Sequence, residues 1–267
     1  MGRIGERMAA LRARGERALV PFMTAGDPDL GVTEALLPAL EAAGADVIEI
    51  GVPFSDPVAD GPTIQRASER ALRAGATLRR ILGMVKALRP RLSVPLVLMG
   101  YANPFLAMGE REFPEAAREA GVDGVIVPDL PPEEEPGFFA ALASCGIDAI
   151  LLAAPTTQPE RLAELARRTR GFLYYVSLTG VTSARTSLPP RLEENLARIR
   201  RVSDVPVCVG FGVSTPEQAA HIGRFADGVV VGSALVDRIA AARSREDAVS
   251  EAARFVAALK APLREPR

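Results

Sequence analysis

Eight short apolar segments separated by amphipathic stretches restrict the folds open to this chain of 267 residues. Each segment is about five residues long and apolar without alternation, which is typical of parallel strands covered on both faces. Helical patterns occupy the intervals between them. The predicted strands are residues 18–23, 46–50, 94–99, 123–127, 147–152, 172–176, 205–209 and 227–231.

The predicted helices exceed one per strand. An additional helix is expected at the N-terminus, and a pair of helices, 63–74 and 77–89, follows the second strand. The remaining helices are predicted at 30–43, 111–120, 133–144, 159–169, 190–201, 215–222, 233–242 and 246–260. Eight strand–helix units in about 250 residues predict a (β/α)8 TIM barrel, with a doubly wound parallel sheet as the alternative. No Ser- or Gly-rich linker divides the chain, so residues 1–267 are expected to form one domain.

Composition argues against several classes of protein. The formal net charge is -1, so no strong field favours nucleic acid or an acidic membrane surface. The N-terminal segment alternates charged and apolar residues and fits neither a signal peptide nor a membrane span. Cys145 and Cys208 lie far apart without metal-ligand spacing. They indicate reduced thiols and a cytoplasmic location.

Glycine-rich loops follow the last predicted strands. The active site of a TIM barrel lies at the carboxyl ends of its strands, and phosphate sites commonly follow strands seven and eight. GFGVS at 210–214 and GSA at 232–234 open helices, whose free N–H groups bind anions. The segment GVT at 180–182, after the sixth predicted strand, could supply a third side of the same anion site. We therefore predict a phosphate-bearing ligand, whereas tight turns alone are the structural alternative.

A glutamate, Glu49, lies in the apolar second strand. An unpaired, partly buried carboxyl group has a raised pKa, which suits proton exchange near pH 7. The alternative is an ion pair across the barrel, although no Lys or Arg lies at the starts of the neighbouring loops. Asp60 follows in the next loop, where its alternative role is a turn or a helix cap. The sole histidine, His221, lies on a predicted helix, so a histidine triad or histidine-rich metal site is not expected.

Four aromatic residues at or beside strand ends are candidates for an apolar substrate pocket, although packing in the barrel core is the default role for any one of them. They are Phe22, Tyr101, Tyr174 and Tyr175.

These residues lie within motifs that resemble the family of tryptophan synthase α subunits almost from end to end. The most specific motif is IEIGVPFSDPVADGPTIQRA at 48–67. The others are PFMTAGDP (21–28), LMGYANP (98–104), GVIVPDLPPEE (124–134), LLAAPTT (151–157), LTGVTSAR (178–185), VGFGVS (209–214) and GVVVGSALV (228–236).

The resemblance implies a retro-aldol cleavage of indole-3-glycerol phosphate to indole and glyceraldehyde 3-phosphate. By the same resemblance, Glu49 is the general acid and base, and the Asp60 carboxylate is hydrogen-bonded to the indole nitrogen. No metal or organic cofactor is expected in this chain. A β subunit carrying pyridoxal phosphate is the expected partner, in an α2β2 assembly.

The resemblance also implies the remaining site residues. Phe22, Tyr101 and Tyr174 would line the indole site, and Thr182 would contact Asp60 when its loop closes. The implied phosphate site consists of Gly180, Gly212, Gly232 and Ser233. The implied partner interface includes Pro53, Asp56, Pro57 and Asn103. One departure from the family is Ser183, where glycine is often found. If the closed loop needs a positive φ or a close approach to the phosphate at this position, serine fits less well than glycine.

Two other functions remain open from the sequence. One is another indole- or sugar-phosphate barrel enzyme of the same pathway, although a decarboxylating synthase would need a lysine at a strand end. The only lysines, Lys86 and Lys260, fall on predicted helices. The other is a subunit whose main role is to activate its β partner.

Overall fold

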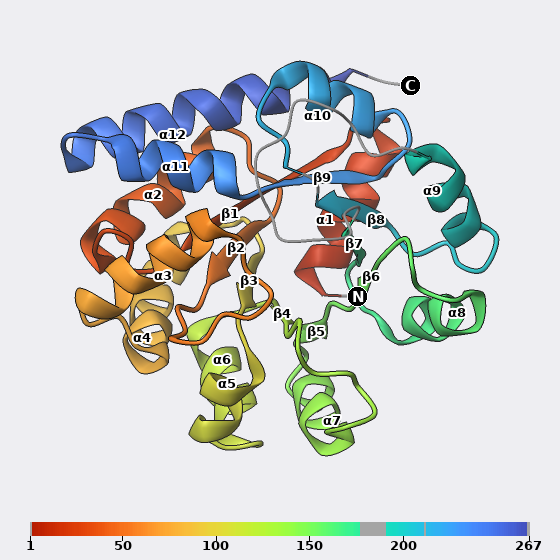
Figure 1. The fold of residues 1–267 in the computed structure, drawn as a ribbon, viewed down its shortest axis with the longest axis horizontal. Helices are drawn as coiled ribbons and strands as arrows, with labels where there is room; N and C mark the ends of the chain where they lie inside the picture. Colours follow the sequence, from red (N-terminus) through yellow and green to blue (C-terminus); the bar gives the residue numbers. More distant parts are fainter. Residues whose placement is uncertain (1, 177–190, 211, 266–267) are drawn as a thin grey trace.

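The computed structural model describes residues 2–176, 191–210 and 212–265. Parallel strands form the centre of the molecule, and most helices lie around them (Figure 1). The sheet order is β5-β4-β3-β2-β1-β9-β8-β7-β6. The strands are β1 (Ala18–Thr24), β2 (Ile48–Gly51), β3 (Leu96–Met99), β4 (Gly124–Ile126), β5 (Asp148–Ala149), β6 (Leu152–Ala153), β7 (Leu173–Val176), β8 (Val207–Gly210) and β9 (Gly228–Val231).

The predicted fifth strand closes the sheet into a ring, although it is divided into β5 and β6. On one side, the Ile150 N–H donates to the Val125 carbonyl at 3.0 Å. On the other side, the Tyr174 N–H donates to the Leu151 carbonyl at 3.0 Å, and Leu152 pairs with Tyr174. One short segment thus has β4 on one side and β7 on the other. The predicted TIM barrel is confirmed, and the doubly wound alternative is wrong because this segment joins the two ends of the sheet.

The helices follow the predicted order, and several begin at a side-chain cap. Asp29, Thr77, Thr215 and Ser244 each accept a backbone N–H in the first turn of a helix. The helices are α1 (Arg3–Ala13), α2 (Leu30–Ala42), α3 (Pro62–Arg73), α4 (Leu78–Leu88), α5 (Ala102–Met108), α6 (Glu112–Ala120), α7 (Pro136–Ser144), α8 (Pro159–Arg168), α9 (Leu192–Arg200), α10 (Pro216–Gly223), α11 (Ser233–Ala241) and α12 (Arg245–Lys260), with 3-10 helices η1 (Arg89–Arg91) and η2 (Ala261–Arg264).

One helix, α5, was not predicted. It is only seven residues long, and its first N–H, that of Ala102, donates to the Asp129 carboxylate at 2.9 Å. Asp129 follows β4, so a residue distant in sequence stabilises the start of this helix. A short helix supported by such a tertiary contact has little local signal.

The predicted N-terminal helix is confirmed as α1, and it packs against the interior of the barrel. Ile4, Met8 and Leu11 belong to the same buried cluster as Val20 and Val47, whose side chains point inward. The larger core lies between the outer face of the sheet and the surrounding helices. Helix α1 therefore covers the amino-terminal end of the barrel, opposite to the end where a TIM-barrel site is expected.

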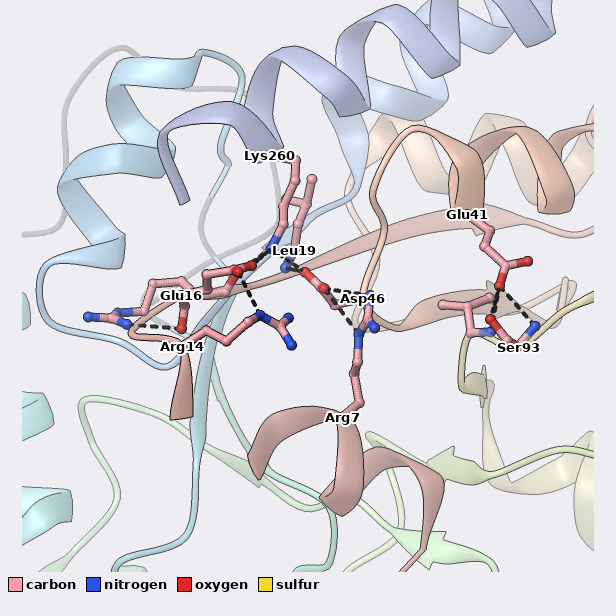
Figure 2. A network of polar contacts seen from close by, with 10 residues as sticks. Arg7, Arg14, Glu16, Leu19, Glu41, Asp46, Ser93 and Lys260 are labelled. Atoms are coloured by element: carbon pink, nitrogen blue, oxygen red, sulfur yellow. Dashed lines mark hydrogen bonds and ion pairs between the residues drawn. The ribbon is translucent and has the colours of Figure 1, made fainter. Parts of the chain in front are cut away.

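A network of polar contacts lies beneath the strands at the amino-terminal end (Figure 2). Asp46, just before β2, accepts hydrogen bonds from the Leu19 N–H and from the Lys260 ammonium, each at 2.8 Å. The Arg7 guanidinium lies 3.0 Å from the other Asp46 oxygen. Lys260 also donates to the Arg17 carbonyl at 2.8 Å. These contacts attach α1 and α12 to the start of β1 and β2.

Both cysteines are free thiols, as predicted. Cys208 is buried inside the barrel, and Cys145 is partly buried against the outer core. Across the described ranges, no helix combines the length and apolar character needed to span a membrane.

Candidate active site

Two adjacent hollows open at the carboxyl ends of the strands, and both are lined by Phe22, Asp60, Ile64 and Met99. The first, here called the Tyr101 cavity, spans about 320 Å³ of empty space, part of it open to solvent, and is also lined by Tyr101, Thr24, Ser68 and Gly100. The second, here called the glycine cavity, spans about 580 Å³ of empty space, part of it open to solvent, and is also lined by Tyr174, Gly210, Gly212, Gly232 and Ser233. Together they form one continuous site at the barrel mouth.

The glycine cavity contains the amino-terminal end of α11. Gly232 is the N-cap, and the buried Ser233 is the first helical residue. The first intrahelical donor is the Leu235 N–H, which bonds to the Gly232 carbonyl at 2.8 Å. The N–H groups before it are those that a helix leaves for an anion. The predicted residues Gly212, Gly232 and Ser233 are therefore together at one wall, as a phosphate site requires.

Glycine is required at one further position of this wall. A Cβ atom at Gly210 would lie 2.5 Å from the Tyr174 hydroxyl oxygen, which is too close for any side chain. Gly210 consequently leaves room for the Tyr174 ring to lie against the end of β8. The ring and the glycine loop share the same cavity.

Glu49 is buried inside the barrel with no exposed surface. Neither of its carboxyl oxygens has a hydrogen-bond partner among the described residues. Burial alone raises the pKa of Glu49 to about 8. An ion pair across the barrel, the structural alternative for this residue, is therefore absent from the described part of the chain.

The surroundings of Glu49 are almost entirely apolar. It is paired in register with Phe22 of β1 and Val97 of β3. Burial raises the pKa values of Tyr174 and Cys208 well above their usual values, and the nearby Glu49 charge raises both further. Glu49 is not a lining residue of either hollow. Its carboxyl group lies one layer below Gly51, which lines the Tyr101 cavity.

Asp60 is partly exposed and lines both hollows. Burial raises its pKa to about 6, and a hydrogen bond from the Tyr101 hydroxyl acts in the opposite direction. The Tyr101 oxygen also accepts the Ala59 N–H at 2.9 Å, which attaches the loop to the cavity wall. The helix after this loop has Gly61 as its N-cap and no side-chain cap. Asp60 therefore does not cap α3, one of its two structural alternatives. The other, a turn, is present in the backbone, because the Asp60 N–H donates to the Pro57 carbonyl at 3.2 Å.

The aromatic candidates divide between the two faces of the sheet. Phe22, Tyr101 and Tyr174 line the site. Tyr175 lies in the core on the outer face of β7, and its buried hydroxyl has no partner among the described residues. The candidacy of Tyr175 for the aromatic pocket was wrong because neighbouring strand residues point to opposite faces. The same alternation, applied to Phe22, indicates Thr24 as a further lining residue, although it was not among the predicted site residues.

The predicted interface residues lie beside the mouth but differ in exposure. Asp56 and Asn103 are exposed, Pro57 is half-buried, and Pro53 is buried within this chain. Val58, which follows Pro57, is 81% exposed, and such exposure is unusual for a large apolar residue. The predicted residues Gly180, Thr182 and Ser183 lie outside the described residues.

No group of three or more His, Cys, Asp or Glu residues lies close enough to hold a metal ion within the described ranges. His221 lies on α10, where its ring contacts Phe225 edge-on.

A barrel mouth that combines a buried acid of raised pKa, a second carboxylate and a glycine-lined helix start defines a class of protein. It is the class of TIM-barrel enzymes that transfer protons on phosphate-bearing substrates. A family model described as tryptophan synthase alpha chain matches residues 8–264. The chain belongs to the tryptophan synthase alpha chain family, as the sequence motifs predicted.

Several similar proteins support this assignment. A tryptophan synthase alpha chain of Geobacter sulfurreducens is 53% identical over 263 residues, which cover 97% of this chain and 98% of that one. Another, of Citrifermentans bemidjiense, is 52% identical over 260 residues, or 97% of each chain. A solved tryptophan synthase from Mycobacterium tuberculosis has a TM-score of 0.91 at 40% identity, covering 99% of each chain. The tryptophan synthase subunit alpha of Legionella pneumophila has a TM-score of 0.90 at 39% identity, covering 98% of each.

Proposed function

We propose that Glu49 and Asp60 are the carboxyl groups that cleave indole-3-glycerol phosphate at this site. The reaction follows from the family: the chain is a lyase of tryptophan biosynthesis that cleaves this substrate to indole and glyceraldehyde 3-phosphate. The assignment of the two residues rests chiefly on one observation. Glu49 is fully buried beside the cavities, and neither oxygen has a partner among the described residues.

The two pKa values match the two roles. With a pKa of about 8, Glu49 is mainly protonated at pH 7 and can donate a proton to C3 of the indole ring. With a pKa of about 6, Asp60 is mainly ionised and can accept a hydrogen bond from the indole N–H, which becomes positively charged. Two carboxyl groups with separated pKa values are a common device for acid–base catalysis.

The cleavage then needs a base. After the Glu49 proton has moved to C3, the Glu49 carboxylate removes the proton from the side-chain hydroxyl group. The oxygen forms the aldehyde carbonyl, the bond between C3 and the side chain breaks, and its electron pair neutralises the ring nitrogen cation. Because Glu49 regains a proton, the enzyme returns to its starting state. Glu49 must reach the cavity for these steps, and it starts one layer below it.

The substrate spans both hollows in this proposal. The phosphate group would lie at Gly212, Gly232 and Ser233, where the start of α11 offers N–H groups. The apolar ring would lie toward Phe22 and Tyr101, beside Asp60. Tyr174 lines the hollow between these ends. Gly180 and Thr182 remain expected parts of the site.

The chain acts together with a tryptophan synthase β subunit. We place the contact at the loop after β2 and the start of α5, where Asp56, Pro57 and Asn103 lie, with Pro53 beneath them. The exposed Val58 supports this assignment, since an apolar side chain in water favours a covering partner. Pyridoxal phosphate would be held by the partner, and this chain would need no cofactor of its own. The proposed location is the cytoplasm.

The test is indole release from indole-3-glycerol phosphate by the purified chain, with and without a β subunit. Glu49→Gln should lower kcat by about 10³-fold, and Asp60→Asn by about 10²-fold. The wild-type kcat/KM should rise through about pH 6 and fall through about pH 8. A Glu49→Gln chain that still activates the β subunit would separate catalysis from a purely activating role. Wild-type rates in either variant would refute the role given to that residue.

A further inference from the structure

Two residues with unpartnered polar atoms are neighbours inside the barrel. The buried side-chain atoms without a partner in the described residues are Thr24 Oγ1, both oxygens of Glu49, and the Tyr175 hydroxyl. Buried polar groups are almost always hydrogen-bonded, so each exception requires an explanation. Tyr175 points away from the barrel interior. Thr24 and Glu49 lie on adjacent strands and share the inner face.

The strand register brings these two residues together. In the β1–β2 pair, Phe22 lies opposite Glu49 and Thr24 lies opposite Gly51. Side chains alternate along a strand, so Thr24 points inward like Val20, and Glu49 points inward like Val47. Thr24 is therefore the diagonal neighbour of Glu49 toward the mouth. Neighbouring strands are about 4.8 Å apart and rise about 3.3 Å per residue, so this diagonal neighbour is about 8 Å away, within reach of a long side chain.

The next inward position above Glu49 on β2 is Gly51, which lies opposite Thr24. Gly51 has no side chain, and a Cβ there would lie 2.5 Å from the Phe22 ring. Phe22 lines both hollows, so its ring covers the space that a side chain at position 51 would fill. A turn of Glu49 toward the mouth therefore requires the Phe22 ring to shift, and no side chain at position 51 opposes it.

We propose that Thr24 is a positioning residue for Glu49: its hydroxyl donates a hydrogen bond to the Glu49 carboxyl group when that group turns toward the cavity. The bond would satisfy both partners and hold one carboxyl oxygen, so that the other faces the substrate. This inference rests on the proposed catalytic role of Glu49. It adds Thr24 to the residues that support catalysis, through a hydrogen bond that forms only when the Glu49 carboxyl group turns toward the cavity.

The other polar groups near Glu49 are less suitable. The Tyr101 hydroxyl already accepts from Ala59 and interacts with Asp60. Tyr174 and Cys208 are the titratable groups that face Glu49, from β7 and β8. The inward residues of β1, β3 and β9 near it are Phe22, Val97 and Val230, none of which ionises. Of the buried hydroxyls without a partner in the described residues, Thr24 Oγ1 is the one on the inner face of the barrel, at the mouth side of Glu49.

The first test compares Thr24→Val with Thr24→Ser. The valine variant keeps the shape but lacks the hydroxyl, so kcat should fall about 10- to 100-fold through misplacement of Glu49, while KM changes less than about 2-fold. The serine variant should recover most of the loss. Tyr175→Phe, which removes the other unpartnered buried hydroxyl on the opposite face of the sheet, should keep the wild-type kcat. Equal losses in the valine and serine variants would contradict the proposal.

The pH profile separates positioning from a general structural defect. A hydrogen bond donated to the Glu49 carboxyl group favours its ionised form, so losing the bond raises the pKa of Glu49 in the substrate complex. The basic limb of kcat should therefore move to higher pH in Thr24→Val. The basic limb of kcat/KM should stay in place, because it reports the free enzyme, in which the two groups do not interact. Unshifted profiles for both parameters would overturn the proposal.

A crystal structure with a non-cleavable indolyl-alkyl phosphate supplies a test independent of activity. Thr24 Oγ1 within about 3.2 Å of a Glu49 oxygen is the expected result. A Glu49 carboxyl group in the cavity with another partner would refute the inference. Failure of the proposed function has a different signature, because Glu49→Gln would then keep its activity. An inactive Glu49→Gln beside a fully active Thr24→Val would refute only the role of Thr24.

Discussion

Asp46 and Glu49 are both buried carboxyl residues of the segment that forms β2, but their surroundings are opposite. Asp46, at the amino-terminal end of the barrel, is bound by the Lys260 ammonium, the Arg7 guanidinium and a backbone N–H (Figure 2). Glu49, three residues nearer to the mouth, has no partner in the described part of the chain. The same chemical group thus occurs paired at one end and unpaired at the other.

This difference assigns the two carboxyl groups different roles: Asp46 contributes to stability, and Glu49 is proposed to serve catalysis. At the amino-terminal end, charges are satisfied and join α1, α12, β1 and β2. At the mouth, an unpaired acid lowers the stability of the folded chain but keeps a proton that can be transferred near pH 7. Barrel enzymes use their two ends in this way, with structural residues below and reacting groups above. Three predictions test the contrast, from the largest expected change in the free energy of unfolding, at one pH or per unit of pH, to the smallest.

The largest effect is expected for Lys260→Met. The substitution preserves bulk but leaves the buried Asp46 without its ammonium partner, so the free energy of unfolding should fall by about 3 kcal/mol. Urea unfolding measures it, and kcat of the folded fraction should be unchanged. Lys86→Met is the matched control, since Lys86 is the other lysine and makes a single exposed ion pair with Glu119. It should change stability by less than about 0.5 kcal/mol. Similar losses in the two variants would contradict the assigned difference between the pairs.

The second effect concerns pH and Glu49→Gln. The pKa of Glu49 is about 8 in the folded chain, compared with 4.5 for an ordinary glutamate. Between these values the folded state holds a proton that the unfolded state has released, so stability falls as pH rises from about 4.5 to 8. The contribution of this group should approach 1.4 kcal/mol per pH unit, and Glu49→Gln should remove it.

The measurement is urea unfolding of the wild type and Glu49→Gln at several pH values in that range. The difference between the two curves isolates Glu49 from other titrating groups, including Asp60. The variant should therefore gain stability relative to the wild type with increasing pH. Parallel curves would mean that Glu49 is not held neutral by burial.

The smallest effect is expected for Arg7→Ala. The Arg7 side chain is 41% exposed, and Asp46 retains Lys260 and the Leu19 N–H without it. The loss of unfolding free energy should be no more than about 1 kcal/mol, and it should shrink in high salt. A loss as large as that of Lys260→Met would mean that the exposed cation is as important as the buried one.

Much of the site could be predicted from sequence because of where strands end. Residues after parallel strands meet at one edge of the barrel, so the sequence predicts that Asp60, Tyr101, Gly212, Gly232 and Ser233 lie together. They do lie around one pair of hollows. Their roles in catalysis and binding remain predictions.

Contacts between distant residues were beyond sequence reasoning. Helix α5 depends on the Asp129 carboxylate. The division of the fifth strand depends on its two neighbours in the sheet, because β5 pairs with β4 and β6 pairs with β7. Lys260 was expected only on a helix, whereas the structure buries it beneath Asp46. No local periodicity carries such information, because the two partners are 214 positions apart.

The sequence by itself determined the order of strands and helices, the barrel class and the set of residues at the mouth. Hydrophobic period and strand-end position are local properties, and they suffice for these conclusions. Only the tertiary structure decided which buried charges have partners. Desolvation and pairing depend on everything packed around a group, so Asp46 and Glu49, nearly adjacent in sequence, acquired opposite roles through their neighbours in space.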